Sequence, residues 1–174
     1  MKKKTAKAVQ FIDGLHEFIV GSPQYRKRTK GKTEVQIQTE IRPLILRYLE
    51  NHFTEQGFRD AERKAIQSFY WEGQEGSYGG GRNPTFGARN YPDFIILSPY
   101  RVAVEYKQSR SGSLVKQLIG QSVVHTMSGD FDYVCCLFHD QNNDGRIRKS
   151  RTQEAESRII ETIWREFNVR LVFA

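Results

Sequence analysis

Two short apolar runs on either side of Ser98-Pro99-Tyr100 place the strongest limit on how this chain can fold. The runs cover residues 91–97 and 101–107 and are apolar on both faces over most of their length. Strands with two apolar faces occur where helices cover both sides of a sheet. The runs therefore predict a hairpin inside an α/β domain of three layers, a mixed β-sheet flanked by helices.

The rest of the chain supplies further elements for such a domain. Apolar residues recur at helical spacing in two N-terminal segments, 5–20 and 33–56. Further along, the patterns predict a strand over 66–72, a helix over 113–127, a strand over 133–138, a helix over 153–167 and a strand over 169–173. The polar segments 73–90 and 139–151 are expected to be loops, and the first is rich in glycine.

Positive charge is concentrated at the N-terminal end of the chain. The formal net charge is +7, and residues 1–32 hold nine Lys and Arg against two acids, whereas the remainder is balanced at 18 against 18. We therefore divide the chain into a basic N-terminal helix and arm, 1–32, and a domain, 33–174. The charge has two interpretations, a solvated tail or a segment that binds phosphate groups.

Apolar runs and cysteines limit the compartment in which the chain functions. No apolar run approaches the roughly 20 residues that span a bilayer, and the N-terminal residues lack the apolar stretch of a signal peptide. The two cysteines are neighbours, Cys135 and Cys136, inside an apolar run. We expect reduced core cysteines and a cytoplasmic protein that does not bind membranes.

The hairpin brings acidic side chains together. A three-residue loop at 98–100 puts Ile95 opposite Ala103, and the same register puts Asp93 opposite Glu105. The Cβ atoms of such cross-strand neighbours lie about 4.5–5.5 Å apart. Lys107 follows Glu105 by two residues and so shares its face. Two carboxylates and one ammonium group are therefore expected on one patch of an apolar sheet.

This patch has the chemistry of a hydrolytic metal site. Like charges placed opposite each other are destabilising, and a divalent cation such as Mg²⁺ relieves the repulsion because it prefers carboxylate oxygens. A metal-bound water then serves as a nucleophile toward a phosphodiester. Lys107 has two possible roles, stabilising the developing negative charge or activating that water. The alternative is a pair of acids near the strand ends that form surface ion pairs.

The spacing of these residues resembles a known signature. Pro92-Asp93, eleven residues and then Glu105-Tyr106-Lys107 are similar to the motif of the PD-(D/E)XK, or restriction-endonuclease-like, nucleases. The order of elements also resembles that family's α-βββ-α-β core. The resemblance implies Mg²⁺-dependent cleavage of DNA, with Mn²⁺ able to substitute. It implies metal ligands at Asp93, Glu105 and the backbone carbonyl of Tyr106, with Lys107 assisting.

Relatives of this kind often add an acid from the first core helix, and some carry a glutamine after the third strand. Glu40 and Glu34 are the candidates for the acid, and we favour Glu40 as catalytic and metal-binding because it shares a face with Ile41. Gln117 and Gln121 are the candidates for the glutamine, and their alternative role is a solvated helix face.

The function predicted from the sequence is a Mg²⁺-dependent DNA endonuclease, either of the restriction or homing type or specific for DNA structure. Such nucleases often act as homodimers, so we expect one here. One alternative is an enzyme similar to archaeal-type Holliday-junction resolvases, which the segments 77–82 and 105–111 resemble. Another is a non-catalytic nucleic-acid-binding module. The basic arm and the loop 73–90 are expected to hold the phosphate backbone.

Three further signals have two interpretations each. The segment 140–145 resembles half of a calcium loop, but an Asp-Gly turn is favoured because Arg151 replaces the expected Glu. His125 lies one turn after Gln121, and a structural role is favoured over a place in the site. Tyr70 and Trp71 either stack on bases or belong to the core, and the core is favoured.

Overall fold

Five strands form one mixed sheet at the centre of the molecule. The computed structural model describes residues 4–23, 31–72, 74 and 91–174. Within them the strand order is β1-β2-β3-β4-β5. Pairing is antiparallel from β1 to β3 and parallel from β3 to β5. The strands are β1 (Phe69–Trp71), β2 (Phe94–Ile96), β3 (Val102–Ser109), β4 (Tyr133–Asp140) and β5 (Val169–Phe173).

Helices connect and cover these strands. Those described are α1 (Ala6–Gly21), α3 (Glu34–Glu55), α4 (Ala61–Gln67), α5 (Ser113–Met127), α6 (Arg146–Ser150) and α7 (Glu154–Phe167). Helix α3 starts with a capping box, in which the Thr33 hydroxyl accepts from the Gln36 N–H and the Gln36 side chain accepts from the Thr33 N–H. This reciprocal cap satisfies two N–H groups that the first turn leaves free. It fixes where the helix begins, four residues before Gln38.

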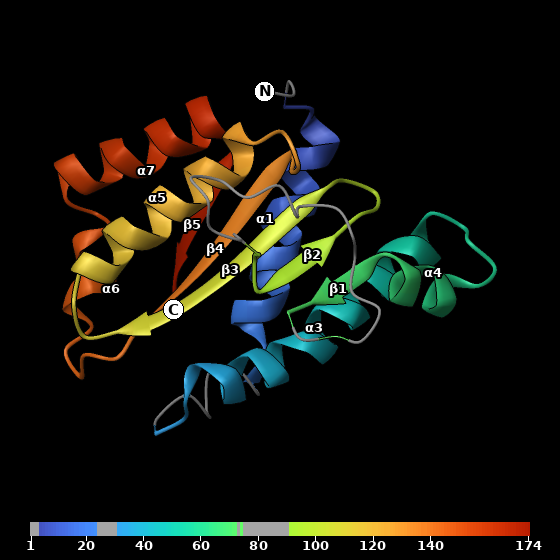
Figure 1. Ribbon diagram of the computed structural model, residues 1–174, viewed down its shortest axis with the longest axis horizontal. Coiled ribbons are helices and arrows are strands. Elements are labelled where there is room, and N and C mark those ends of the chain that lie inside the picture. Colours follow the sequence, from blue (N-terminus) through green and yellow to red (C-terminus); the bar gives the residue numbers. More distant parts are fainter. Residues whose placement is uncertain (1–3, 24–30, 73, 75–90) are drawn as a thin grey trace.

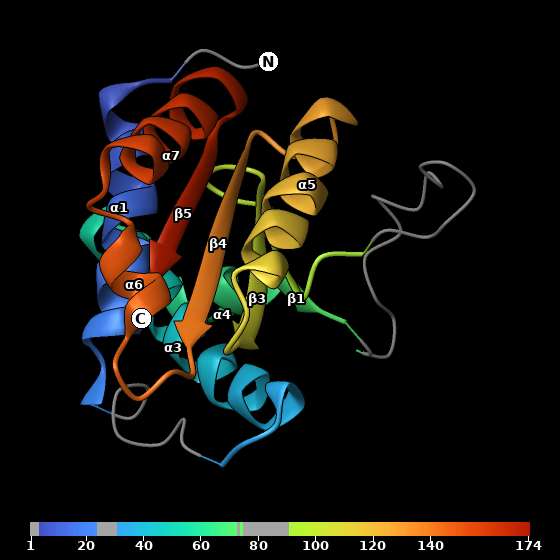
Figure 2. The same ribbon diagram turned by 90° about the vertical axis from the view of Figure 1, so that its left-hand side faces the viewer.

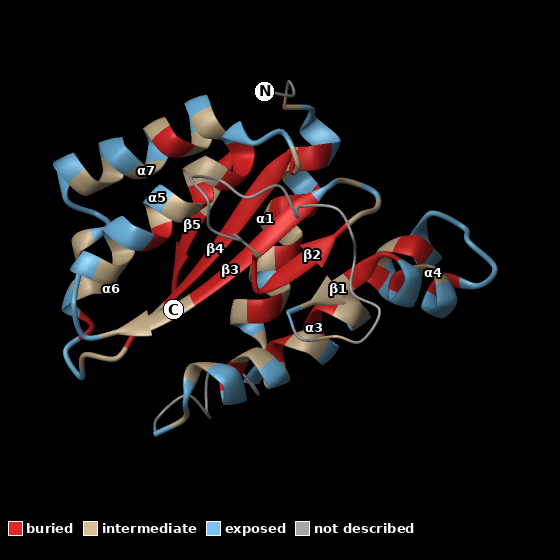
Figure 3. Ribbon diagram, viewed as in Figure 1, coloured by how far each residue is buried: buried red, intermediate tan, exposed pale blue. Residues whose placement is uncertain are grey.

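The sheet has a separate apolar core on each face. One core joins α1 and α3 to alternate strand residues, including Val104 and Tyr106. The other joins α5 and α7 to the intervening residues, including Ala103. In Figure 1, α1 lies behind the sheet while α5 and α7 lie in front of it, and Figure 2 shows the arrangement from the side. Most strand residues are buried, and β1 and the C-terminal end of β3 include half-buried ones (Figure 3). The predicted α/β fold with a mixed sheet flanked by helices is confirmed.

The hairpin has the register that the sequence predicts. Ile95 pairs with Ala103, and its neighbours Phe94 and Ile96 pair with Val104 and Val102. The ladder is shorter than expected, because β2 begins only after Asp93. Continued by one residue, the register puts Asp93 opposite Glu105.

Two expectations about local structure were wrong. The strand predicted over 66–72 is only Phe69–Trp71, and it follows helix α4, which ends at Gln67. Asp60 caps α4 by accepting from the Arg63 N–H, and Ile66, the first residue of the predicted strand, is 57% exposed on this helix. The loop predicted over 139–151 also contains the short helix α6. Helix α4 projects from the body of the molecule at the right of Figure 1.

The N-terminal helix shares the core of the domain. Phe11, Ile12 and Leu15 are buried in the same cluster as residues of α3 and the sheet. Most of the basic arm, residues 24–30, and most of the glycine-rich loop, residues 75–90, lie outside the described residues. The expected boundary after residue 32 stays a prediction. Among the described helices, none is both long and apolar enough to cross a membrane.

Candidate active site

Asp93 directly precedes strand β2, beside the part of β3 that extends beyond the paired residues of the hairpin. Its Oδ2 atom accepts a hydrogen bond of 2.7 Å from the backbone N–H of Tyr106. Its Oδ1 atom accepts one of 2.8 Å from the side-chain amide of Gln38 on α3. The residue is 8% exposed. A carboxylate has about four lone-pair positions, so these two bonds orient Asp93 and leave capacity for another partner.

Glu105 lies on β3 and is fixed from the other side of the sheet. It is 5% exposed, and its Oε1 atom lies 2.8 Å from Nε2 of His125 on α5. His125 is itself buried and packs edge-on against Phe131. Among the described residues, nothing donates a hydrogen bond to Oε2 of Glu105. One carboxylate oxygen is therefore anchored and the other is available.

The two acids repel each other inside the protein. Burial, and after it the negative charge of Glu105, raise the pKa of Asp93 to about 7, although the Tyr106 hydrogen bond and the charge of Lys107 act in the opposite direction. So high a pKa means that the nearby hydrogen bonds and positive charge do not fully offset the cost of ionising this carboxyl group. Added positive charge at this position would therefore stabilise the pair of carboxylates.

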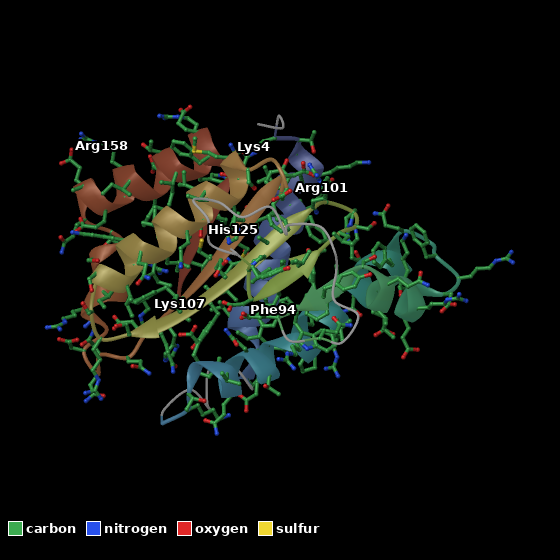
Figure 4. All side chains as sticks on the ribbon, viewed as in Figure 1. Lys4, Phe94, Arg101, Lys107, His125 and Arg158 are labelled. Carbon is green, nitrogen blue, oxygen red and sulfur yellow. The ribbon has the colours of Figure 1, made fainter. Side chains whose placement is uncertain are left out.

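Lys107 supplies one positive charge beside the acids. Its Nζ atom lies 2.6 Å from Oε1 of Glu34, the first residue of α3. Burial lowers the pKa of Lys107, but the Glu34 hydrogen bond and the charges of Asp93 and Glu105 outweigh it, so the pKa is raised overall. Lys107 is therefore an ammonium group at neutral pH and a poor proton acceptor. Figure 4 shows Lys107 on β3 and His125 on α5, which passes over that strand.

The two acids predicted on α3 have different partners. Glu34 contacts Lys107, whereas Glu40 forms its ion pair with Lys32, outside this group. The arrangement therefore brings Glu34 rather than Glu40 to the hairpin. Glu40 is half-buried and directly precedes buried Ile41, but its ion pair is with Lys32 and not with Lys107.

Gln38 and His125 are the contacts that sequence reasoning did not assign to the site. Gln38 lies one turn after Glu34 and three residues before buried Ile41, a spacing that puts all three on one helix face. That spacing was the available signal for Gln38. His125 had the helical spacing from Gln121 as its signal, and its contact with Glu105 places it at the edge of the site.

The backbone of Tyr106 faces the same opening as Asp93. The carbonyl of Arg101, the residue before β3, accepts from the N–H of Tyr133, so the carbonyl of Arg101 points toward β4. Successive residues of a strand point their N–H and C=O groups to opposite edges. Tyr106 therefore directs its carbonyl, like its N–H, toward the β2 edge, where β2 has not yet begun.

These groups fit Mg²⁺ with few protein ligands. Among the described residues there is no cluster of three or more His, Cys, Asp and Glu that would enclose a metal ion. Mg²⁺ commonly takes one or two carboxylates and keeps several waters or substrate phosphate oxygens. Asp93, Glu105 and the Tyr106 carbonyl meet that smaller requirement.

The glutamines of α5 differ in their surroundings. Gln117 is exposed, whereas the Oε1 atom of Gln121 is buried and accepts no hydrogen bond from the described residues. Gln121 precedes His125 by one turn on the helix that covers β3. Of the two predicted glutamines, Gln121 is thus the one with a buried oxygen that accepts no hydrogen bond from the described residues.

The segment after β4 forms a turn. Oδ1 of Asp140 accepts from both the backbone and the side-chain amide of Asn142, and Oδ2 accepts from the N–H of Arg148. Asp144 accepts from the N–H of Arg146. Because these carboxylates serve the backbone around them, the geometry agrees with the favoured Asp-Gly turn.

Comparison with known proteins does not assign the chain to a family. No family model matches it, and neither a curated protein nor a solved structure is significantly similar to it. The chemistry of the hairpin must therefore be argued from its own residues.

Proposed function

We propose that this protein is a Mg²⁺-dependent DNA endonuclease built on a restriction-endonuclease-like core. The observation that carries the proposal is the convergence of two buried carboxylates and one ammonium group on a single hairpin. Burial of two acids opposite each other costs free energy in a folded protein. Such a cost is typical of functional sites, where groups are arranged for chemistry rather than for stability.

The donor set supports a hard cation over the other common metals. Carboxylate and carbonyl oxygens suit Mg²⁺ or Mn²⁺, whereas the thiols of Cys135 and Cys136 are buried in the sheet and their pKa values are raised. In the proposal Asp93, Glu105 and the Tyr106 carbonyl hold the ion. When bound, Mg²⁺ supplies Lewis acidity toward a phosphate oxygen and lowers the pKa of a coordinated water.

The side chains around the ligands have separate tasks. Gln38 and the Tyr106 N–H orient Asp93, and His125 orients Glu105. Lys107 remains protonated, so it stabilises the negative charge that develops on the phosphate and does not act as the general base. Glu34 restrains the Lys107 side chain and keeps its charge close to the two acids. The basic residues of the N-terminal arm would add contacts to the DNA backbone.

A plasmid assay tests this function. Supercoiled plasmid is incubated with the protein in Mg²⁺, in Mn²⁺ and in EDTA. We expect nicking with either metal and none in EDTA, and a loss of at least a hundredfold in Asp93→Asn and Lys107→Ala. Two exposed residues beyond β4 give matched controls, Asp144→Asn and Lys149→Ala, which should retain activity.

The outcomes separate the enzyme from the alternative class. Cleavage that persists in EDTA, or that survives both site substitutions, would reject the proposed site. Binding of DNA without cleavage of duplex, branched or single-stranded substrates would instead identify a nucleic-acid-binding module.

A further inference from the structure

An arginine and a tryptophan form a cation–π pair at the outer strand of the sheet. The guanidinium carbon of Arg42, on α3, lies 5.1 Å from the ring centroid of Trp71, the last residue of β1. Trp71 is half-buried, and its ring centroid lies 5.8 Å from that of Phe69. Among the described strands β1 is at the edge of the sheet, and α3 passes beneath it in Figure 1.

This pair is adjacent to the proposed active site. Trp71 pairs with Phe94, the residue that follows Asp93. The next residue of the chain, Glu72, donates its backbone N–H to the carbonyl of Asp93 at 3.1 Å. Arg42 follows Gln38 by one turn of α3, and Gln38 bonds Asp93 directly. Trp71 and Arg42 are therefore each close in the chain to a residue that bonds Asp93, the proposed metal ligand: Glu72 follows Trp71, and Gln38 precedes Arg42 by one helical turn.

Arg42 has hydrogen-bonding capacity that the described residues do not use. Its Nε atom is buried and donates no hydrogen bond to them. It also forms no ion pair with any described acid. A buried donor without a partner costs free energy, which suggests that a partner is present in the functional complex. An arginine fork matches the oxygens of a phosphate.

The second tryptophan provides a contrast. Trp164 is also contacted by cations, Lys4 at 5.1 Å and Arg170 at 5.4 Å. Both cations have acceptors, because Lys4 donates to the Arg165 carbonyl and Arg170 pairs with Asp13. Trp164 belongs to a structural cluster near α1 and α7, beside β4 and β5 and away from β1 at the other edge of the sheet.

We infer that Arg42 and Trp71 form a subsite for an unpaired nucleotide beside the scissile phosphate, Arg42 binding its phosphate and Trp71 stacking with its base. The inference rests on the proposed nuclease function and narrows its substrate class. Bases of continuous duplex stack on one another, so a base reaches an aromatic side chain only where pairing is interrupted. The subsite therefore selects branched or splayed DNA over continuous duplex.

Fluorescence of Trp71 reports on this contact directly. The chain contains two tryptophans, so Trp164→Phe leaves Trp71 as the sole indole and keeps an aromatic ring at position 164. In a Lys107→Ala background, which retains the metal ligands, this protein is titrated in Mg²⁺ with a splayed-arm oligonucleotide and with a fully paired duplex of equal length. We expect the splayed DNA to quench Trp71 strongly and to bind at least about tenfold more tightly, since stacking of one base has an effect on the order of five- to a hundredfold.

Two variants separate stacking from charge. In the Lys107→Ala background, Trp71→Leu should remove most of the preference for splayed DNA and leave the Kd for duplex within about twofold. Arg42→Gln should weaken binding of both DNAs and lower the slope of log Kd against log salt by about one. The quenching measurement keeps the test valid if Trp71→Leu folds poorly, because it needs no substitution at Trp71.

The failures are distinguishable. Equal affinity for the two DNAs, or binding of splayed DNA without quenching, would overturn the subsite while wild-type plasmid cleavage upheld the nuclease. Absence of Mg²⁺-dependent cleavage by the wild-type protein, together with absence of DNA binding, would overturn both.

Discussion

The side-chain amide of Gln38 donates a 2.8 Å hydrogen bond to Oδ1 of Asp93. This bond connects helix α3 to the hairpin, and its two residues are 55 positions apart along the chain. The other oxygen of Asp93 is held by the Tyr106 N–H. The carboxylate thus has a fixed orientation before any cation arrives, which reduces the cost of binding one.

Removing the Gln38 amide should release Asp93. In Gln38→Ala we expect Mg²⁺ affinity and kcat/KM to fall about tenfold or more, as for other groups that orient metal ligands. The free energy of unfolding should fall by about 1–2 kcal/mol, because the buried carboxylate loses a donor. The exposed Gln67→Ala on α4 is the control. An unchanged Mg²⁺ dependence in Gln38→Ala would show that the bond does not prepare the site.

Neutralising Asp93 should stabilise the protein when no metal is present. Because burial and Glu105 raise the pKa of Asp93 to about 7, the folded state holds the proton more tightly than the unfolded state does. The resulting stability is present below about pH 4 and is lost as pH rises through 7. In EDTA at pH 8, urea unfolding should show Asp93→Asn to be more stable than wild type by about 1–3 kcal/mol.

Asp132 is the matched control for that prediction. It is 6% exposed, like Asp93, but its carboxylate pairs with Arg101 at 3.1 Å. Asp132→Asn should therefore destabilise the protein under the same conditions, since it removes a compensated charge. If both substitutions destabilised the protein equally, the repulsion between Asp93 and Glu105 would not be significant.

Glu34 and Glu40 provide a matched pair on one helix. Each contacts a lysine, but only Glu34 contacts Lys107. We expect Glu34→Gln to lower kcat/KM about tenfold, because Lys107 loses its restraint, and Glu40→Gln to change it by less than about twofold. Steady-state cleavage of one oligonucleotide compares them. A larger loss in Glu40→Gln would favour the acid that we preferred from the sequence.

Acid should weaken the turn after β4. Burial tends to raise the pKa of Asp140, but hydrogen bonds from Arg148 and Asn142 outweigh it and hold the pKa below its usual value. Its contribution to stability is therefore complete above about pH 4 and is lost as pH falls through the lower folded-state value. Asp140→Asn should unfold more easily at pH 7, by about 1–2 kcal/mol, and the difference from wild type should shrink toward pH 2.

Exposed Asp144 is the control for this pH dependence, because it accepts one backbone hydrogen bond where Asp140 accepts several. Urea unfolding of Asp144→Asn across the same pH range should follow the wild type closely. A gap between wild type and Asp140→Asn that stayed constant down to pH 2 would contradict the assignment.

The sequence was sufficient for the hairpin register and for helix α5. Register follows from a local property, the three-residue length of the loop 98–100, because a loop longer by one residue would turn the paired side chains to different faces. The bounds of α5 match the predicted 113–127, since the apolar periodicity of that segment is uninterrupted.

Contacts between distant segments were harder to predict. Gln38 and His125 are polar residues on helices, and helix periodicity alone does not show which polar residue meets which strand. Whether Glu34 or Glu40 lies beside Lys107 depends on how α3 packs against the hairpin, and this tertiary contact is not encoded in the helical spacing. Residues 61–67 form a helix because Asp60 caps them, although Ile66 and the aromatic run that follows favour a strand by propensity.

The central claim, that the hairpin acids hold a divalent cation, is tested most directly by crystals of the protein grown with Mn²⁺ and measured for anomalous scattering. The account predicts one strong peak between the carboxylates of Asp93 and Glu105 and beside the Tyr106 carbonyl, absent from Asp93→Asn crystals grown in the same way. No peak at the hairpin, or a peak that persists in the Asp93→Asn protein, would contradict it.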